Sequence, residues 1–255
     1  MNARIHHFLE LLWGMTEKEL RARYKYTILG FLWLLINPIL QMIVIGFVFT
    51  FFMKEPVSHY YYYLFIGLLI WNFFSFSLTD ITPSIVTERD LIKKSAFPRI
   101  IIPLSIIVSN LIHFFVAFVL LLLPVFFLKT MSIDTIPFVF AGLALLILFT
   151  TGISLMTCSI DVRFRDINFM VHAILIVWFY ASPIVYSVTQ IPNHILWLWQ
   201  LNPLTSILQL FQHGILGSAA PTPVMLLSNC FVIALTTTVG FLIFRKENKT
   251  FDDWI

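Results

Sequence analysis

Residues 100–128 read IIIPLSIIVSNLIHFFVAFVLLLLPVFFL, a run of 29 residues that contains no Asp, Glu, Lys or Arg. A helix needs roughly 20 apolar residues to cross a hydrocarbon core of about 30 Å, so this stretch is long enough to span a bilayer. Such a run satisfies all its backbone hydrogen bonds internally when it is helical. The sequence therefore predicts an all-α integral membrane protein. Further uncharged runs lie at residues 26–53, 56–79, 135–160 and 167–244.

The composition of the whole chain agrees with a lipid environment. Its 255 residues are 59% hydrophobic and 11% charged, whereas soluble domains carry about 25% charged residues. The formal charge of +3 gives no argument for binding nucleic acid. The N-terminal residues mix charged and apolar side chains, so we expect no cleaved signal peptide. The two cysteines, Cys158 and Cys230, are expected near opposite membrane faces, which disfavours a disulfide between them.

We divide the chain into an N-terminal segment, residues 1–25, and a membrane domain, residues 26–255. Residues 189–223 are rich in Pro, Asn, Gln and His, which are costly against lipid. We therefore expect two short external helices there, at about 193–201 and 204–216, which lie on the membrane face or dip into it as re-entrant or gate helices. A seventh crossing is the alternative. The six predicted transmembrane spans are about 26–53, 62–86, 100–128, 136–160, 168–188 and 223–244.

Basic residues gather on one side of these six spans, and Lys and Arg are enriched in cytoplasmic loops. With the N-terminus inside, 14 of the 16 Lys and Arg residues are cytoplasmic, and Lys54 and Lys129 are external. A seventh span would move the basic C-terminal tail to the other side. We therefore expect a multi-pass protein of the cytoplasmic (inner) membrane with both termini in the cytoplasm.

The N-terminal segment has the pattern of an amphipathic helix that lies in the plane of the membrane interface. Its charged and His residues avoid one helical face. The helix is a membrane anchor alone, or an anchor that also docks a cytoplasmic partner. The side chains on the apolar face are Ile5, Phe8, Leu9, Leu12, Trp13, Leu20 and Tyr24.

The loop TERDLIKKSAFP, residues 87–98, predicts a short cytoplasmic helix over residues 88–96. Acidic residues occupy its first turn, basic residues its last turn, and a proline follows. Thr87 and Asp90 resemble a capping box. The helix is a solvated connector or a coupling device. The charged loop at 161–166 could fold alongside it, or could only enforce the topology.

Asp80 is the only acidic residue within a predicted span. Ionisable residues inside a membrane often mark proton or substrate paths, but Asp80 lies near the cytoplasmic end, where water can reach it. It therefore serves packing and hydration, or a proton relay. The polar residues that form a stripe with it are Asn72, Ser75, Thr79 and Thr82.

Two histidines have an amide partner at helical spacing, His113 with Asn110 and His172 with Asn168. We expect both pairs to face inward. They form hydrogen bonds between helices or line a substrate path. The four tyrosines at 60–63 are typical of an aromatic belt at the headgroup level, as are Trp197 and Trp199.

Motifs for catalysis are missing from the sequence. It has no His-Glu-x-x-His and no Gly-x-Ser-x-Gly, and none of its nine glycines is followed by Lys, so there is no P-loop for ATP. We expect no catalytic residue and no metal site, and energy that comes from a partner or a gradient. The rival hypothesis is a membrane enzyme that acts on a lipid-linked substrate through Asp80, His113 and His172.

Residues 20–38, LRARYKYTILGFLWLLINP, resemble the permease subunits of type-2 ABC exporters that move polysaccharides. The resemblance extends over the whole chain through several motifs in the same order. The matching residues of the first motif are Arg21, Tyr24, Leu29, Gly30, Trp33, Asn37 and Pro38. The later motifs are DLIKKSAFPR at 90–99, RD at 165–166, SPIVY at 182–186 and NPLT at 202–205.

This resemblance implies a homodimer that binds two copies of an ABC ATPase subunit. This complex would export a lipid-linked O-antigen, teichoic acid or capsule-like glycan across the cytoplasmic membrane. For an O-antigen, the export would be a step of lipopolysaccharide biosynthesis. ATP and Mg²⁺ would be bound by the ATPase, with no cofactor in this chain. An ABC permease for drugs or smaller lipids is the alternative within the same fold.

The resemblance also assigns roles to particular residues. A coupling helix to the ATPase would include Glu88, Arg89, Asp90, Lys93 and Lys94. The interfacial helix would contribute Arg21, Arg23 and Tyr24. The substrate path would include Trp33, Trp71, Asp80, His113, His172, Trp178 and Tyr180. The external gate would include Trp197, Asn202 and Pro203.

Overall fold

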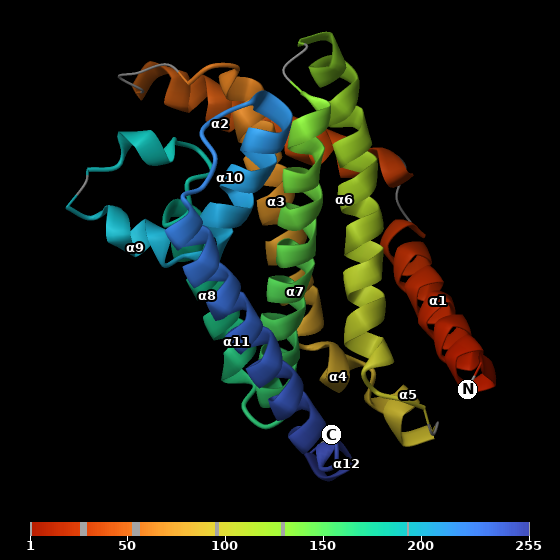
Figure 1. The fold of residues 1–255 in the computed structure, drawn as a ribbon. Helices are drawn as coiled ribbons and strands as arrows, with labels where there is room; N and C mark the ends of the chain where they lie inside the picture. The colour runs from red at the N-terminus through yellow and green to blue at the C-terminus, as the bar shows by residue number, and fades with distance from the viewer. Residues whose placement is uncertain are drawn as a thin grey trace.

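The computed structural model of the chain describes residues 2–25, 30–52, 57–94, 97–128, 131–192 and 194–254, and these contain helices and no strand. Long helices run side by side as a bundle, and shorter helices connect or cover them (Figure 1). The α-helices are α1 Asn2–Tyr24, α2 Trp33–Phe52, α3 Tyr60–Ile81, α4 Ser84–Thr87, α5 Arg89–Lys94, α6 Ile101–Leu128, α7 Ile136–Asp161, α8 Asp166–Tyr180, α9 Leu196–Gln200, α10 Pro203–Leu216, α11 Pro223–Glu247 and α12 Phe251–Trp254. The 3-10 turns are η1 Gly30–Leu32, η2 Ile133–Thr135 and η3 Val188–Gln190.

Four helical segments among the described residues are long and apolar enough to cross a membrane: Tyr60–Ile81, Ile101–Val125, Ile133–Asp161 and Pro223–Glu247. They fall on four of the predicted spans, so the all-α integral membrane class is confirmed. The helices α2 and α8 give shorter apolar stretches, and α2 is steeply inclined to the bundle (Figure 1). The number of crossings therefore stays a prediction.

The centre of the bundle is filled by side chains from α3, α6, α7 and α10. Phe74 and Phe149 stack with ring planes 5° apart. Phe114 and Phe211 meet edge to face with ring centroids 6.0 Å apart. Because all four rings are buried, the described core of a single chain is closely packed.

The fifth predicted span, residues 168–188, is wrong at its C-terminal end, because α8 stops at Tyr180. Pro183 disfavours the helical conformation for the residue before it. With 15 residues, α8 is about 22 Å long at 1.5 Å per residue, less than the hydrocarbon thickness. The chain instead turns at residues 181–187 and packs against the start of α3.

Two of the tyrosines at 60–63, Tyr60 and Tyr63, contact this turn, so the prediction of an aromatic belt at the headgroup level is wrong for these two. Tyr63 is 4% exposed, and its hydroxyl donates to the carbonyl oxygen of Tyr186 at 3.1 Å. Tyr60 donates to the carbonyl oxygen of Val185 at 3.0 Å. Of these four tyrosines, Tyr61 is the exposed one, at 45%. Buried Tyr hydroxyls need a partner, and the irregular backbone after α8 supplies it.

The helix predicted at 204–216 is confirmed as α10, but it lies inside the bundle rather than on its surface. Its side chains from Leu204 to Ile215 are largely buried against α3, α7 and α11. Asn202 caps its start by accepting the amide hydrogen of Leu204, and Gly217 ends it at a φ of 66°. With 14 residues, α10 is too short for a seventh crossing. The shorter α9 lies within the other predicted helix, whose first residue, 193, is outside the described residues.

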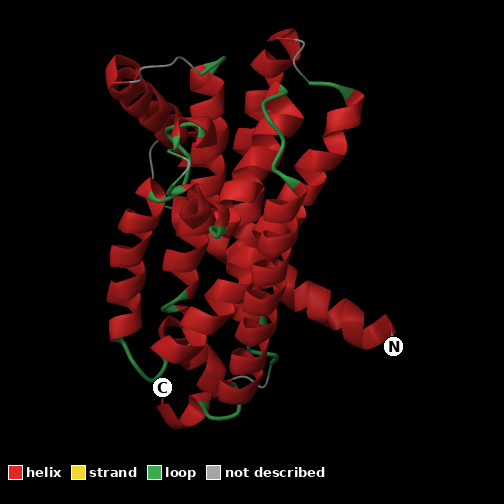
Figure 2. Cartoon of the chain, turned by 60° about the vertical axis from the view of Figure 1, so that its left-hand side comes forward, coloured by secondary structure: helices red, strands yellow, loops and turns green. Residues whose placement is uncertain are grey.

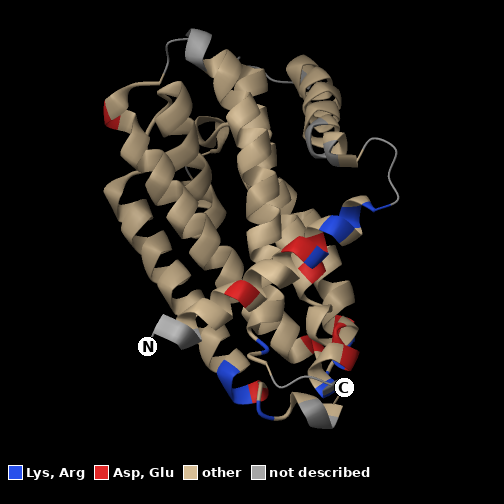
Figure 3. Cartoon of the chain, turned by 90° about the vertical axis from the view of Figure 1, so that its right-hand side faces the viewer, with Lys and Arg blue, Asp and Glu red and all other residues tan. Residues whose placement is uncertain are grey.

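Charged residues lie along α1 and gather toward the end of the bundle that carries α4, α5 and the C-terminal ends of α7 and α11 (Figure 3). The helix α1 packs against α6 through the buried Thr16, while its N-terminal end projects from the bundle (Figure 2). Three apolar residues on this projecting part, Ile5, Leu9 and Trp13, are more than half exposed. This surface fits the predicted interfacial helix, whose position relative to a membrane stays a prediction.

The helix predicted over residues 88–96 is confirmed over Arg89–Lys94 as α5, but its predicted capping box is wrong. The chain forms α4, turns at Glu88, and then forms α5, while residues 95–96 lie outside the described residues. Thr87 does not cap this helix, because its hydroxyl donates to the Pro83 carbonyl oxygen within α4. The local competition of a Thr hydroxyl for a backbone carbonyl explains the error. The second predicted span, 62–86, is too long at its C-terminal end. Its helix α3 ends at Ile81, because Pro83 separates it from α4.

Candidate functional site

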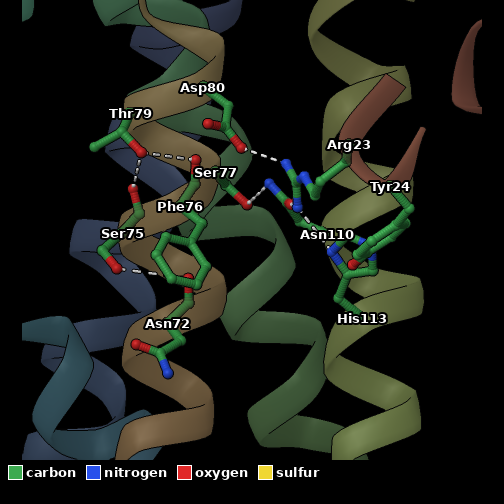
Figure 4. Close-up of polar contacts among 10 residues, drawn as sticks. All are labelled: Arg23, Tyr24, Asn72, Ser75, Phe76, Ser77, Thr79, Asp80, Asn110 and His113. Atoms are coloured by element: carbon green, nitrogen blue, oxygen red, sulfur yellow. Dashed lines mark hydrogen bonds and ion pairs between the residues drawn. The ribbon is translucent and has the colours of Figure 1, made fainter. Parts of the chain in front are cut away.

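Arg23, near the end of α1, joins three helices through its guanidinium group (Figure 4). Its Nη2 donates to Asp80 Oδ2 of α3 at 2.7 Å, and its Nη1 donates to Asn110 Oδ1 of α6 at 2.8 Å. The same Nη1 lies 2.8 Å from His113 Nδ1. Asn110 donates in turn to Ser77 Oγ at 3.3 Å. These five residues form a set that we call the polar cluster.

The polar cluster determines which nitrogen of His113 carries the proton. A guanidinium group only donates hydrogen bonds, so Nδ1 accepts from Arg23 and carries no hydrogen. The proton then lies on Nε2, which is 3.1 Å from Tyr24 Oη. The ring of His113 is therefore neutral, and each of its nitrogens has a hydrogen-bond partner. This favours a role in joining helices.

The ion pair between Arg23 and Asp80 is half-exposed, with 32% and 40% of the two side chains accessible. Arg does not deprotonate in proteins, so it cannot pass a proton to or from Asp80. The contact favours packing and hydration over a proton relay. It also holds the end of α1 against the end of α3.

A cavity of about 270 Å³ lies beside the polar cluster, between α1, α2, α3 and α6. Apolar rings and amide groups line it together, so it suits a molecule with an apolar part and a polar head. Its aromatic lining is Tyr24, Trp33, Phe73, Phe76 and Phe114, and its polar lining is Arg23, Asn37, Asn72, Asn110 and His113. The sequence analysis did not single out Gln41, whose Oε1 accepts a hydrogen bond from Asn72 Nδ2 at 3.1 Å. An amide side chain within an uncharged run was the signal that could have indicated it.

The predicted path residues do not meet in one place. Trp33 and His113 share the cavity described above. Trp71 is buried and packs edge to face on Phe179 at 5.4 Å. Trp178 packs on Phe74 at 5.1 Å between α8 and α3. Two of the aromatic residues are thus part of the core of the chain.

The other two path residues of α8 lie on its outer face. Tyr180 is 61% exposed, and His172 is exposed as well. The prediction that His172 faces inward is therefore wrong for a single chain, whereas Asn168 is half-buried. The reason is the helical phase of α8, which turns Val171 and Leu175 toward the bundle and so turns the next residue away.

At the charged end, Lys18 of α1 reaches the turn between α4 and α5. Its Nζ lies 2.6 Å from Glu88 Oε1 and 2.7 Å from Glu88 Oε2. A cavity of about 420 Å³ adjoins this pair and extends to Asp80. Glu19 also lines it, and burial raises the pKa of the Glu19 carboxyl above its ordinary value. The interfacial helix and the predicted coupling region are thus joined directly, a contact between distant residues that no sequence pattern signalled.

The remaining predicted coupling residues are presented outward. Arg89 and Asp90 have 65% and 79% of their side chains exposed, and Lys93 is exposed. The side chain of Lys94 lies outside the described residues. On α1, Arg21 forms an ion pair with Glu17 on the surface. These charges form a surface that could meet a polar partner.

Near α9, hydrogen bonds join the segments that carry the SPIVY and NPLT motifs. Asn202 Oδ1 accepts from Trp178 Nε1 at 3.1 Å, and its Nδ2 donates to Ser182 Oγ at 2.9 Å. Trp199 Nε1 donates to Tyr186 Oη at 2.6 Å. Pro203 begins α10 beside them, whereas Trp197 is 57% exposed. A cavity of about 470 Å³ adjoins Trp178, Trp199, Asn202 and Pro203.

The loop at 161–166 contacts the C-terminal residues of the chain. Arg163 Nη2 lies 2.7 Å from Glu247 Oε2, and its guanidinium carbon is 5.3 Å from the ring of Trp254. Arg99 donates to the Asn248 carbonyl oxygen at 2.6 Å. We call the contacts of Arg163 with Glu247 and Trp254 the C-terminal clasp. This contact was missed because its partners lie about 80 residues apart or more in the sequence.

Residues 10–216 match the family described as ABC-2 type transporter. The chain belongs to this family. The ABC-2 match contains the polar cluster, the α4–α5 region and the helices α9 and α10. Membership means that this is the membrane subunit of a transporter, which pairs with an ABC ATPase, and it agrees with the expectation that the chain is not an enzyme.

Two relatives of this ABC-2 chain match along nearly its whole length. A protein of Myxococcus xanthus named O-antigen export system permease protein RfbA is 31% identical over 252 residues, which are 95% of each chain. A protein of the same name from Klebsiella pneumoniae is 31% identical over 259 residues, 98% of this chain and 97% of its own.

Proposed function

We propose that the chain is the permease subunit of an ATP-driven exporter that moves a lipid-linked O-antigen across the cytoplasmic membrane. The observation that carries this proposal is the 31% identity to two proteins named as O-antigen export permeases, over 95% or more of the chain. Similarity of this extent includes the membrane helices, the α4–α5 region and α10 together. Which sugars the glycan contains would depend on the binding specificity of the partner proteins and of the transport path.

The transport path would lie between two copies of the chain. The described core of one copy is filled by buried rings, as in Phe74, Phe149 and Phe211. Large apolar side chains face outward on α2, α8 and α11 instead, and these can contact lipid or a second copy. Trp33, His172 and Tyr180 are exposed on such faces, so they are available to line a path between subunits. The exposed apolar residues of these helices include Phe47, Phe51, Phe169, Val177, Leu227 and Phe231.

The ATPase would bind at the charged end, with one ATPase subunit on each permease chain. The outward charges of Arg89, Asp90 and Lys93 would contact it, with both termini on the same, cytoplasmic, side. Bound ATP and Mg²⁺ would belong to the ATPase. The pair Lys18–Glu88 would pass a movement of α5 to α1, and Arg23 would pass it to α3 and α6.

The gate for the polymer would lie around α9 and the start of α10. There the hydrogen bonds of Asn202 hold α8 and α10 together, so a shift of α10 would break them. Trp197 would lie at the outer surface of this gate. Pro203 would fix the direction in which α10 enters the bundle.

The rival function, a membrane enzyme, needs Asp80, His113 and His172 to act together. Two of these belong to the polar cluster, and Arg23 and Tyr24 occupy both nitrogens of the His113 ring. The third is exposed on α8. This separation argues against a shared reaction centre within one chain.

The proposal is tested in a strain from which the gene for this chain is deleted and the gene for its ATPase is kept. The wild-type chain, supplied on a plasmid, is expected to restore O-antigen on intact cells, and the tagged chain is expected to retain the ATPase during purification. O-antigen that reaches the surface without the chain would overturn the proposal. The alternative cargo, drugs or smaller lipids, is tested by ATP hydrolysis of the reconstituted complex, which lipid-linked glycan alone is expected to stimulate.

A further inference from the structure

Two cavities adjoin each other where α3 begins and α10 ends, at the opposite end of α3 from Asp80. Their volumes are about 260 and 420 Å³, and they share Tyr63, Ser187, Thr189 and Ser218. Ligand pockets for small molecules measure about 300–1,000 Å³, so the joined space is large enough for a sugar residue. It lies apart from the polar cluster and from the cavity beside Trp33.

The lining of this space mixes polar and apolar residues and carries no Asp, Glu, Lys or Arg among the described residues. Recognition of a strongly charged ligand would call for such residues. Hydroxyl and amide groups, in contrast, match the hydroxyl groups of a neutral sugar, since each can donate or accept. We call this joined space the diol pocket. Its hydrogen-bonding side chains are those of Tyr63, Ser187, Thr189, Gln209, Gln212 and Ser218.

Two amides in the diol pocket have an atom without a hydrogen-bond partner. Gln212 is 2% exposed, and its amide interacts with the Tyr63 hydroxyl. Its Nε2 carries two hydrogens, and none of the described residues accepts a hydrogen bond of good geometry from it, so at least one of these hydrogens is available to a ligand. Gln209 Oε1 is buried and likewise has no donor within the described residues. Buried polar atoms normally find a partner. One free donor and one free acceptor therefore await a ligand.

The positions of these two amides fit a pair of neighbouring hydroxyl groups. Gln209 and Gln212 are three residues apart on α10, so their side chains lie on the same face of the helix. One hydroxyl of a sugar can donate to Gln209 Oε1, while the next accepts from Gln212 Nε2. A water can bridge both atoms, since it donates and accepts, whereas a vicinal diol satisfies each atom with a separate hydroxyl group.

The walls of the diol pocket are held in place before any ligand binds. Gly217 ends α10 in the left-handed region, and His213 Nδ1 lies 2.6 Å from the Ser218 carbonyl oxygen. On the opposite wall, Ser187 and Gln190 form a capping box around η3. Such preorganisation reduces the entropy lost on binding.

We infer that the diol pocket binds the vicinal hydroxyl groups of a neutral sugar residue, with Gln209 as acceptor and Gln212 as donor. The inference rests on the proposed function, which brings a glycan to the side of the membrane where this pocket opens. During export, the diol pocket would bind a sugar residue of the glycan at a position outside the buried core of the chain.

The test uses the detergent-solubilised full chain in complex with its ATPase, with mannotriose and per-O-methylated mannotriose as probes. Saturation-transfer NMR is expected to show binding of mannotriose and none of the methylated sugar, which has no hydroxyl to donate. Gln212→Leu and Gln209→Leu are each expected to weaken binding about tenfold, since each removes a hydrogen bond at a buried site. Gln209 is half-buried, so its variant keeps the test valid should Gln212→Leu fail to fold. Asn248→Leu, which removes a half-buried amide at the end of α11 and outside the lining of both cavities, is the matched control and is expected to bind as the wild type does.

Unchanged binding in both pocket variants, or no binding by the wild type, would overturn the inference. A wild-type chain that restores export yet binds no mannotriose would contradict the diol pocket alone. A chain that binds mannotriose through Gln209 and Gln212 yet restores no O-antigen would contradict the proposed function while leaving the pocket in place.

Discussion

Lys18 Nζ and Glu88 Oε1 lie 2.6 Å apart and join the interfacial helix to the turn between α4 and α5. The Glu88 side chain is 19% exposed and that of Lys18 48%, so the pair is only partly screened by water. Five residues later on α1, Arg23 contacts α3 and α6. Two basic side chains of α1 thus connect the α4–α5 region with α3 and α6.

Reversing one charge of this pair is expected to impair export. In Glu88→Lys, two ammonium groups would repel each other and separate α1 from the α4–α5 region, so surface O-antigen should fall while the chain still folds. The double variant Lys18→Glu with Glu88→Lys restores opposite charges and should recover export. Thermal unfolding of the four proteins should give a coupling energy of about 0.2–1 kcal/mol.

Glu10→Lys is the control for this reversal. Glu10 lies on the same helix with 60% of its side chain exposed and contacts His6 and His7, four and three residues away. Export should be unaffected by it. Equal loss of export in Glu10→Lys and Glu88→Lys would mean that the net charge of α1, rather than the contact, matters.

The two variants Arg23→Met and Asp80→Asn are expected to differ in severity. Arg23→Met removes the donor that serves Asp80, Asn110 and His113 and should lower the free energy of unfolding by about 1–3 kcal/mol. Asp80→Asn keeps an oxygen acceptor and should leave export near the wild-type level. Complete loss of export in Asp80→Asn, with normal folding, would instead support a proton relay.

Gly240 is expected to be intolerant of any side chain, because α7 and α11 approach each other closely there. A Cβ on Gly240 would lie 2.0 Å from the carbonyl oxygen of Gly152, a backbone atom that cannot turn aside. Gly240→Ala should destabilise the protein by about 1–3 kcal/mol, measured as the thermal unfolding midpoint in detergent.

Gly14→Ala provides the comparison for that measurement. A Cβ at Gly14 would meet no atom within 4 Å, and Ala favours a helix over Gly by about 0.5–1 kcal/mol. This variant should be as stable as the wild type or more so. A similar loss of stability in both variants would contradict the close approach of α7 and α11.

The sequence predicted the membrane class and the approximate places of four long helices, because long uncharged runs leave few other solutions. It also placed α10, because the polar residues and prolines of 189–223 argue against a full membrane crossing there and favour short helices. It failed for α8, where the effect of Pro183 on the preceding backbone outweighed the apolar composition. It failed for Tyr63 because a tyrosine beside a span has two common positions, the headgroup layer and a buried site with a partner. Contacts such as Lys18–Glu88 depend on how distant helices pack and leave no periodic signal.

The C-terminal clasp is expected to hold the tail of the chain. In Arg163→Ala, Glu247 loses its ion pair and Trp254 its cation, a combined effect of about 1–2 kcal/mol. The last residues should then be cleaved faster by carboxypeptidase in solubilised protein. Arg165→Ala, two residues away and exposed, should leave the rate unchanged, and faster cleavage in this control would argue against the clasp.

The central claim is that the α4–α5 region is the docking site for an ABC ATPase. Its most direct test is disulfide cross-linking in cells. The chain carries a single cysteine at position 90, and its Cys158 and Cys230 are replaced by alanine. A series of ATPase variants, each with one cysteine, is expressed with it. Asp90→Cys is expected to form a covalent adduct with the ATPase, and Asp134→Cys, in the η2 turn at the other end of α7, is expected to form none. An adduct at Asp134→Cys, or none at Asp90→Cys with any ATPase cysteine, would contradict the claim.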